Sequence, residues 1–199
     1  EPQLEEIGSR HERLYALYWG ADQQDPHHVV ENWLDANAFK ASEQWVGDVR
    51  FVIYALHAHS ERDRRALNAD FEDGITLQAY AVPQVSFKPG DIIPVTLYWG
   101  ADFPVQERYK VFLHLVDQNG QLVAQQDSEP AGGAAPTTGW QAGDDIVDNQ
   151  GVLLPQTLQQ GSYALIVGMD LRDDPEARLD IDYNGSVSDM LNLGTMIVE

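Results

Sequence analysis

The spacing of hydrophobic positions changes partway along this chain, near residues 57–70. Before that stretch, continuous apolar runs and one helical repeat predict a short strand–helix–strand segment. After it, short alternating segments are separated by turn residues, a pattern typical of antiparallel β-structure. The stretch between them is polar, highly charged and without either period, which indicates a surface linker. We therefore predict a strand–helix–strand segment at 1–56, a linker at 57–70 and a β-sandwich domain at 71–199.

The first segment is predicted to contain strands at 14–19 and 48–56, both with apolar residues on both faces. Asp25 and Pro26 provide an N-cap and a first-turn proline for the helix between them. Such a unit is normally joined by a right-handed crossover into a parallel sheet. Because two strands cannot bury both of their own faces, the segment must pack on the second unit, pair with a neighbour or continue a domain upstream.

The second unit is predicted to be an antiparallel sandwich of the immunoglobulin or fibronectin type. Short strands separated by turn residues at this spacing are the signature of that architecture. The strands are expected at 75–82, 91–99, 108–117, 121–127, 145–154, 162–170, 177–183 and 192–198. The clearest hairpin turn is the sequence DQNG at 117–120, between two alternating runs. The expected core residues are Trp99, Phe112, Leu113, Tyr163, Leu165 and Val167.

Composition narrows the range of functions. A net charge of −20, from 32 acidic and 12 basic residues, repels phosphate backbones, so we predict no nucleic-acid partner. Apolar residues make up 43% of the chain, enough for a core, but no stretch reaches the roughly 20 residues that cross a bilayer. The absence of cysteine excludes disulfides and thiolate nucleophiles. No glycine-rich phosphate cradle or nucleophile elbow occurs, and we predict no cofactor.

Trp140 is the candidate ligand-binding residue. It lies in a loop rich in glycine and threonine, where an exposed indole would stack on a sugar ring, as a carbohydrate-binding sandwich requires. A tryptophan in such a loop more often closes the end of the sandwich. Both roles remain open from the sequence.

Two groups of residues have the chemistry of metal ligands. His57 and His59 would share one face of a strand, but they lie in the charged linker without an evident third ligand. Carboxylates suited to calcium are Asp170, Asp173, Asp174, Asp180 and Asp182, with a second set at Asp144, Asp145 and Asp148. Their spacing fits no EF-hand loop, and solvated turns are the favoured interpretation. We assign no metal ligand and no catalytic residue.

Several stretches together carry a family resemblance. They are VENWLD at 30–35, SEQWVGDVR at 42–50, Tyr54, FEDGI at 71–75, KPGD at 88–91, LYW at 97–99, YKVFLHL at 109–115, DSEP at 127–130 and LLP at 153–155. In this order they resemble the soluble C-terminal region that follows the membrane core of some bacterial glycosyltransferases. Those enzymes are similar to the dolichyl-phosphate-mannose–protein mannosyltransferase group. The resemblance spans nearly the whole chain, and its motifs are features of the fold rather than catalytic motifs.

The resemblance implies a non-catalytic accessory domain on the extracytoplasmic face of a bacterial membrane. Its partner would be the membrane-embedded part of the same polypeptide, and its role to position an acceptor or glycan. The acidic active-site residue of that family belongs to a segment absent here, so no catalytic residue is carried over. The chain begins at Glu1 without an initiator Met, and we expect it to be a piece of a larger protein. The alternatives are a free-standing carbohydrate-binding module and a metal-dependent enzyme using His57 and His59.

Overall fold

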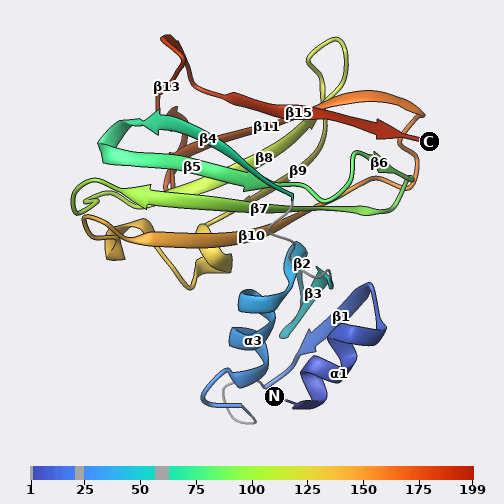
Figure 1. Cartoon of the computed structure of the whole chain (residues 1–199). Helices are drawn as coiled ribbons and strands as arrows, with labels where there is room; N and C mark the ends of the chain where they lie inside the picture. The colour runs from blue at the N-terminus through green and yellow to red at the C-terminus, as the bar shows by residue number, and fades with distance from the viewer. Residues whose placement is uncertain (1, 21–24, 57–62) are drawn as a thin grey trace.

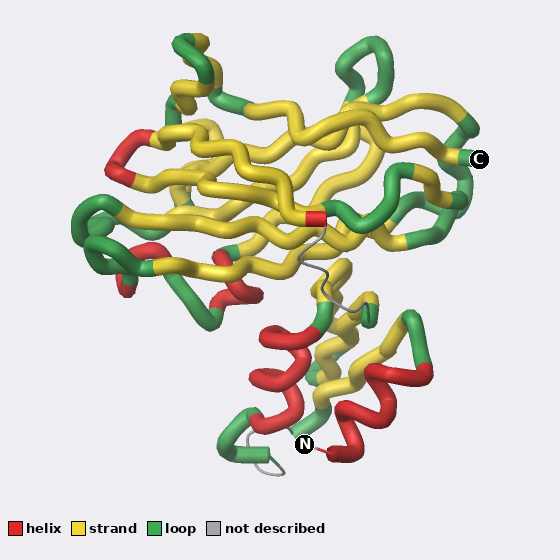
Figure 2. Tube along the Cα trace, viewed as in Figure 1, coloured by secondary structure: helices red, strands yellow, loops and turns green. Residues whose placement is uncertain are grey.

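The structure, a computed structural model, describes residues 2–20, 25–56 and 63–199 of the chain. Two β-sheets form a sandwich, and a smaller N-terminal unit projects from one side of it (Figure 1). The α-helices α1 (Pro2–Arg10) and α3 (Val29–Asn37) both lie in the N-terminal unit. The rest consists of strands, loops and the short 3-10 helices η2 (Glu72–Gly74), η3 (Pro130–Gly133) and η4 (Thr137–Gly139) (Figure 2). The predicted fold class, a mainly β sandwich preceded by a small α/β segment, is confirmed.

The first sheet has nine strands in the order β1-β3-β2-β10-β7-β5-β4-β13-β14. Their bounds are β1 Arg13–Tyr18, β2 Phe39–Val46, β3 Val49–Ala55, β4 Arg64–Phe71, β5 Ile75–Ala81, β7 Ile92–Ala101, β10 Asp145–Leu153, β13 Ile181–Tyr183 and β14 Ser186–Ser188. The second sheet runs β6-β15-β11-β8-β9, with β12 also paired to β11. Its bounds are β6 Ser86–Phe87, β8 Tyr109–Val116, β9 Leu122–Ser128, β11 Gly161–Leu171, β12 Asp174–Arg178 and β15 Leu191–Val198. The described pairings are antiparallel except β2 with β10 and β6 with β15.

Seven of the eight strands predicted for the sandwich coincide with observed strands to within two residues at each end. The hairpin at 117–120 is also confirmed, because β8 pairs with β9 across it. The Asp117 carboxylate accepts the backbone N–H groups of Asn119 and Gln121, each at 2.8 Å. Gly120 supplies the positive φ, 77°, that this turn requires.

The strand predicted at 177–183 is instead two strands in different sheets. β12 belongs to the second sheet and β13 to the first, so the chain crosses the sandwich at Leu179 and Asp180. Leu179 donates its N–H to the Met169 carbonyl at 3.0 Å on one side of the crossing. Asp180 is held on the other side by Glu72, whose N–H donates to the Asp180 carbonyl at 3.1 Å. A strand that changes sheets has to bend, which interrupts its pairing.

The main hydrophobic core lies between the two sheets. Alternate residues of each strand point into it, as the period of two requires. From β7, β8 and β11 the core receives Ile93, Val95, Leu97, Trp99, Val111, Leu113, Leu115, Tyr163, Leu165, Val167 and Met169. Trp99 is fully buried and meets Phe71 edge to face, with ring centroids 5.2 Å apart. Each fully buried aliphatic or aromatic side chain contributes roughly 1.5–3 kcal/mol.

Five of the six predicted core residues lie in this core, and the sixth, Phe112, is buried elsewhere. Phe112 is only 1% exposed, but it alternates with the core residues of β8 and therefore lies on the outer face of the second sheet. Its ring rests on the backbone of Gly168, where an added Cβ would stand 2.1 Å from the Phe112 Cζ. The Arg178 guanidinium covers the ring at 4.7 Å from its centroid. The prediction that Phe112 is buried is confirmed, but it is buried on the outer face of the second sheet and not in the core between the sheets.

In the N-terminal unit, the predicted parallel pairing of the first and last strands is wrong. β1 and β3 are antiparallel neighbours, and an unpredicted strand, β2, pairs antiparallel with β3 on its other side. β2 and β3 form a hairpin through the turn at Gly47 and Asp48, where Gly47 has φ 64°. Because β3 runs opposite to both neighbours, β1 and β2 point the same way. The helix α3 therefore does connect two parallel strands, but with β3 inserted between them.

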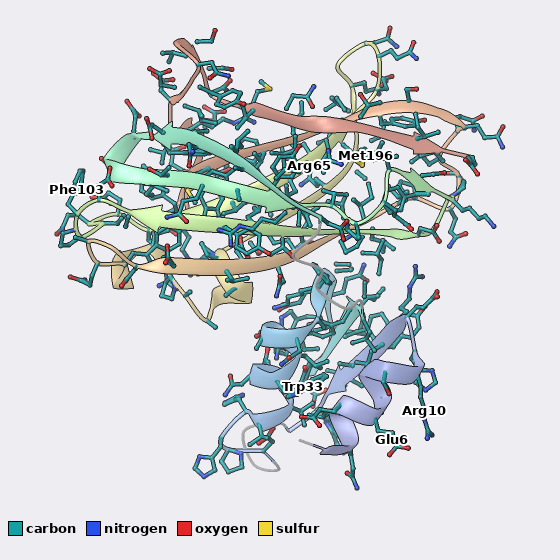
Figure 3. All side chains as sticks on the ribbon, viewed as in Figure 1. Glu6, Arg10, Trp33, Arg65, Phe103 and Met196 are labelled. Atoms are coloured by element: carbon teal, nitrogen blue, oxygen red, sulfur yellow. The ribbon has the colours of Figure 1, made fainter. Side chains whose placement is uncertain are left out.

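Helix α3 packs on one face of this small sheet, where Leu34 joins a hydrophobic cluster with Val52 and Tyr54 of β3. The predicted start of the helix is wrong: α3 begins at Val29 with His28 as its N-cap, so Asp25 is not the N-cap and Pro26 is not in the first turn. The Asp25 carboxylate still accepts the Val30 N–H at 3.1 Å. The backbone hydrogen bonds from Val29 and Val30 lower the pKa of Asp25. Trp33 of α3 reaches α1, where its Cη2 lies 3.2 Å from the position a Cβ on Gly8 would occupy (Figure 3).

The N-terminal unit is joined to the sandwich through one edge of the first sheet. β2 pairs in parallel with β10 at Lys40 and Gln150, so the small sheet continues the large one. Gly151 of β10 leaves room for this approach, because an added Cβ would stand 2.9 Å from the Ala41 Cβ. A small apolar cluster that includes Phe39, Ala41 and Ile92 closes the junction. Of the three outcomes left open by the sequence, packing on the second unit is the one observed.

Part of the predicted linker is a strand. Residues 57–62, including His57 and His59, lie outside the described residues. Residues 64–70 belong to β4, which pairs with β5. The charge of these residues led to the prediction of a linker. In the structure Arg64 lies over the Tyr98 ring on the outer face of the sheet, 4.1 Å from the ring centroid, and Ala69 is buried on the inner face. None of the helices in the described part of the chain has the length and apolar character that crossing a bilayer needs.

Candidate functional site

Two β-bulges lie side by side on the first sheet, where β4, β5 and β7 run together. Between β4 and β5, Ala66 pairs with Ala79 and Ala69 pairs with Leu77, so β4 has two residues opposite the single residue Gln78. One of the two is Asn68, which adopts a left-handed conformation with φ 56°. Between β5 and β7 the register shifts again at Gln78. Bulges redirect side chains and bend strands, and they are common beside binding sites.

The bulges border an open groove of about 590 Å³ on the outer face of the sheet. Small residues form part of its lining, among them Ala79, Gly100 and Ala101, all of which are buried. Polar side chains of several kinds line the rest: Arg64, Asn68, Thr76, Gln78, Asp102, Asp144 and Asp145. A floor of small residues lets a ligand lie close to the backbone, with the longer polar groups around it.

Gln78 is the central polar group of this groove. Its Nε2 donates to the Asp145 Oδ1 of β10 at 3.2 Å, so the side chain reaches across the whole of β7. Gly100 of β7 makes this possible, because a Cβ there would stand 2.4 Å from the Gln78 Nε2. The amide keeps an oxygen acceptor and a second N–H donor, which a bound hydroxyl group would engage.

Two aromatic residues, Tyr98 and Phe103, are close in sequence to lining residues of the groove but do not line it. Tyr98 of β7 is partly exposed, and the Arg64 guanidinium stacks over it. Phe103 follows Asp102 at the tip of the sandwich (Figure 3) and is 51% exposed, with its ring held against Gly74. Aromatic faces beside amide and carboxylate groups suit a ligand that has both apolar ring faces and hydroxyl groups.

The charges of the groove are unequal. Asp102, Asp144 and Asp145 are all exposed and outnumber the single cation, Arg64. Asp144 also holds its own turn, accepting the Gln141 N–H at 2.8 Å. With a net charge of −20 on the chain, this surface favours neutral or cationic ligands over anionic ones.

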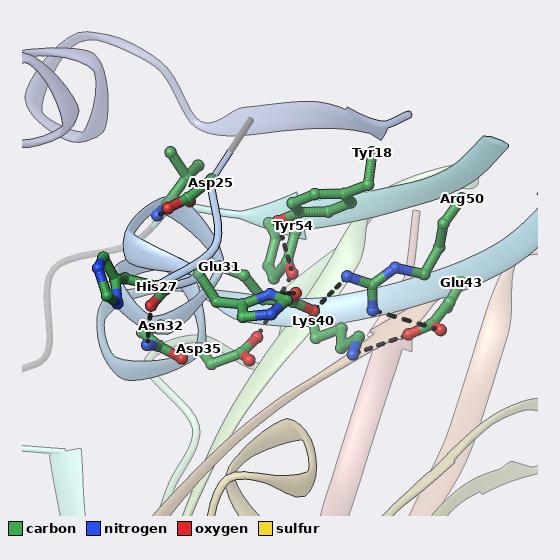
Figure 4. Close-up of polar contacts among 12 residues, drawn as sticks. Tyr18, Asp25, His27, Glu31, Asn32, Asp35, Lys40, Glu43, Arg50 and Tyr54 are labelled. Carbon is green, nitrogen blue, oxygen red and sulfur yellow. Dashed lines mark hydrogen bonds and ion pairs between the residues drawn. The ribbon is translucent and has the colours of Figure 1, made fainter. Parts of the chain in front are cut away.

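A second polar cluster lies within the N-terminal unit (Figure 4). The Tyr54 hydroxyl donates to the Asp35 Oδ1 at 3.4 Å and lies 3.5 Å from the Tyr18 hydroxyl. Burial raises the pKa of Asp35 to about 6, against the attraction of Lys40, and burial also raises the pKa of Tyr54.

The charges of this cluster are satisfied among themselves. Arg50 pairs with Glu31, and Lys40 pairs with Glu43 at 2.8 Å. Because its basic groups face carboxylates of the same unit, the arrangement serves to hold α3 on β3, and we do not assign it a ligand.

Trp140 does not lie in the groove. It is 2% exposed within the main core, with its ring centroid 6.5 Å from that of Trp99. Its Nε1 donates to the Ala135 carbonyl at 3.0 Å. The indole therefore offers no open face to a sugar ring, and its position matches the other role weighed from the sequence, closure of the sandwich end.

The acidic sets that suggested calcium do not form a metal site. Among the described residues, no group of three or more His, Asp or Glu side chains is placed to hold a metal ion. Asp170 pairs with Lys110 at 3.5 Å, whereas the Asp173 side chain is 93% exposed. Asp148 is buried in the sandwich, apart from its exposed neighbours Asp144 and Asp145. The His57 and His59 hypothesis lies outside the described residues and stays untested.

The sequence did not reveal the groove, because the groove is defined by the bulges, and a bulge depends on the register in which two strands pair. Asn68 falls in the predicted linker, and Gln78 reads as an ordinary outward position of a strand. Gly100 is the one local signal, since glycine inside a strand often marks a close approach of another group.

Comparisons with known proteins give only distant structural likenesses. No protein-family model matches the chain, and no curated protein matches it. A crystal structure of the C-terminal domain of wzt is 13% identical, with a TM-score of 0.44, and the match covers 69% of this chain and 81% of that one. The β-glucuronidase of Bacteroides uniformis is 13% identical with a TM-score of 0.36, covering 67% of this chain and 18% of the enzyme. Spo0M from Bacillus subtilis is 13% identical with a TM-score of 0.32, covering 68% of this chain and 50% of Spo0M. The resemblance to membrane glycosyltransferases is not addressed by these matches and stays a prediction.

Proposed function

We propose that this chain is a non-catalytic, glycan-binding β-sandwich module that holds its ligand in the groove at the two bulges. The observation that carries the proposal is the redirected Gln78 side chain, bound to Asp145 across Gly100. Sugar recognition uses amide and carboxylate groups that meet hydroxyls, together with aromatic faces that meet the ring. The groove supplies the first kind of group, and the exposed ring of Phe103, next in sequence to the lining residue Asp102, supplies the second.

The excess of carboxylates favours a neutral or amino sugar. An anionic glycan, built from uronic acids or phosphosugars, would meet three aspartates against one arginine in a chain of net charge −20. At physiological ionic strength, the interaction between exposed charges extends over about 8 Å, so the aspartates act on a ligand bound in the groove.

The family resemblance suggests where such a module would act. We propose an accessory role on the extracytoplasmic face of a bacterial membrane, in which the groove presents a glycan or glycosylated acceptor to a membrane-embedded glycosyltransferase. Transfer activity of the purified chain with a polyprenyl-phosphate sugar would contradict the non-catalytic part of this proposal.

A glycan array followed by titration calorimetry tests the binding site. We expect binding to a neutral or amino-sugar oligosaccharide and about a tenfold loss in the Gln78→Ala variant, the size of one hydrogen bond of about 1.4 kcal/mol. The matched control is Gln125→Ala on β9, which removes an equivalent Gln–Asp bond, to Asp127 at 2.8 Å, on the other sheet. Equal losses in the two variants, or exclusive binding of anionic glycans, would overturn the proposed site.

A further inference from the structure

The N-terminal unit has an exposed strand edge. β1 is the last strand of its sheet, and among the described residues it pairs only with β3. A hollow of about 360 Å³ is lined by residues 14–19 together with residues of α3 and the turn before it. Because consecutive residues of a strand point to opposite faces, a hollow lined by six of them in a row lies along the strand's edge. Within the described part of the chain, the edge of β1 is thus unpaired and has space beside it.

The backbone groups on this edge are those of alternate residues. Leu56 donates its N–H to the Glu12 carbonyl at 2.8 Å, so the Glu12 carbonyl points toward β3. In an antiparallel pair the direction alternates along the strand. The N–H and C=O groups of Arg13, Tyr15 and Leu17 therefore point away from β3, toward the open edge.

The side chains along this edge are unusually apolar for a surface. Tyr15 is 57% exposed, Leu17 70% and Trp19 65%. They leave on the order of 400 Å² of largely apolar surface, within the size range of patches that mark interaction sites. On the helix-covered face, Leu14 and Tyr18 belong to the small core of the N-terminal unit but are only partly buried. Side chains on both faces of β1 are thus left partly or largely exposed.

We propose that β1 pairs antiparallel with β1 of a second copy of this chain, joining two three-stranded units across a two-fold axis at Ala16. Reversal of the sequence RLYALYW at 13–19 about that residue exchanges leucine with tyrosine, so each leucine of one copy meets a tyrosine of the other. In this register Tyr15 lies opposite the partner's Leu17, and Leu14 lies opposite the partner's Tyr18. Aromatic–aliphatic cross-strand pairs of this kind stabilise antiparallel sheets.

The same register satisfies both hydrogen bonding and charge. It places odd-numbered residues opposite odd-numbered residues, and those carry the outward N–H and C=O groups. Arg13, whose guanidinium donates to the Gly90 carbonyl at 2.7 Å, comes opposite the partner's Trp19, and no two like charges face each other within the strand. A two-fold interface requires such self-complementarity, and an edge strand with these features is a template for pairing.

A cysteine placed at the two-fold position tests the register directly, because the chain contains no cysteine. Ala16 would face its own copy in a non-hydrogen-bonded pair, with Cα atoms about 4.5 Å apart, within the range that a disulfide spans. We expect the Ala16→Cys variant of the full chain to form a covalent dimer on mild oxidation. The matched control is Leu122→Cys at the edge strand β9 of the other sheet, with a 43% exposed side chain, which we expect to stay mostly monomeric.

Analytical ultracentrifugation provides a measurement without cysteine. We expect the unmodified chain to approach twice its monomer mass as concentration rises, and Leu17→Lys to remain monomeric because it buries an unpaired charge at the interface. Val187→Lys on β14, a similarly exposed position, should still dimerise. The measurements belong at physiological salt or above, because a net charge of −20 on each copy opposes association. A monomer at all concentrations, together with equal crosslinking of the two cysteine variants, would overturn the proposal. The same result is expected if another segment or a lipid surface covers this edge.

Discussion

Replacing Asp148 with asparagine tests the electrostatics of the sandwich interior. The Asp148 carboxyl is fully buried between the sheets and, among the described residues, has no basic partner. It accepts hydrogen bonds from the Ala131 N–H at 2.9 Å, the Gln150 Nε2 at 2.8 Å and the Trp99 Nε1 at 3.4 Å. Burial outweighs these hydrogen bonds and raises the pKa of Asp148 from its ordinary 3.8 to about 6.

This pKa makes the free energy of unfolding depend on pH. The folded state holds the proton more tightly than the unfolded state does, so the stabilisation from Asp148 is complete below about pH 4. It is lost as the pH rises through about 6. A difference of about two pKa units corresponds to about 3 kcal/mol at 1.36 kcal/mol per unit.

Urea denaturation of the unmodified chain and of Asp148→Asn, at several values from pH 4 to pH 8, isolates this contribution. The asparagine does not titrate, and its Oδ1 can still accept the Ala131 N–H. Its amide can donate to the Gln150 Oε1, which has no hydrogen-bond partner among the described residues, once the Gln150 amide turns over. We expect the difference between the two free energies of unfolding to shift by about 3 kcal/mol in favour of the variant between pH 4 and pH 8. Asp35, whose pKa is also raised to about 6, is present in both proteins and cancels. Parallel pH profiles would refute the reasoning.

Two further substitutions test the packing of the sandwich. Trp140→Ala should lower the free energy of unfolding by about 3–5 kcal/mol in chemical denaturation, because it empties a core site; an unchanged stability would show that the indole is not part of the core. Gly168→Ala should cost about 1–3 kcal/mol, because the new Cβ meets the Phe112 ring. Gly139→Ala is its control, since a Cβ there has no neighbour within 4 Å, and equal losses for the two glycines would contradict this account of Phe112.

The local pattern was sufficient for seven of the eight strands predicted in the sandwich. Strand positions follow from alternation, and the hairpin at 117–120 follows from turn chemistry that acts within four residues. Burial of Trp99, Leu113 and Leu165 follows from the same alternation. Phe112 shows where the local pattern stops being sufficient. Its burial was predictable because it is aromatic, but its contact with Gly168 and Arg178 depends on which segments lie over the outer face of the second sheet.

The candidate site lay beyond the reach of a single sequence. A bulge is a mismatch in pairing between strands, so Gln78 and Asn68 acquire their special positions only when β4, β5 and β7 are aligned. The burial of Trp140 is likewise a property of the whole sandwich end, which is why the residue could be read either as a sugar platform or as a plug.

The sequence by itself determined where most of the sandwich strands and the hairpin turn at 117–120 occur, which residues are apolar enough to be buried, and that the chain carries a large negative charge. The tertiary structure alone decided that β3 inserts between β1 and β2, that the N-terminal unit continues the sheet at β10, and that part of the charged stretch becomes β4. The physical reason is the range of the forces involved. Backbone preferences and turn hydrogen bonds act between near neighbours, whereas register and sheet order depend on contacts between segments far apart in the chain.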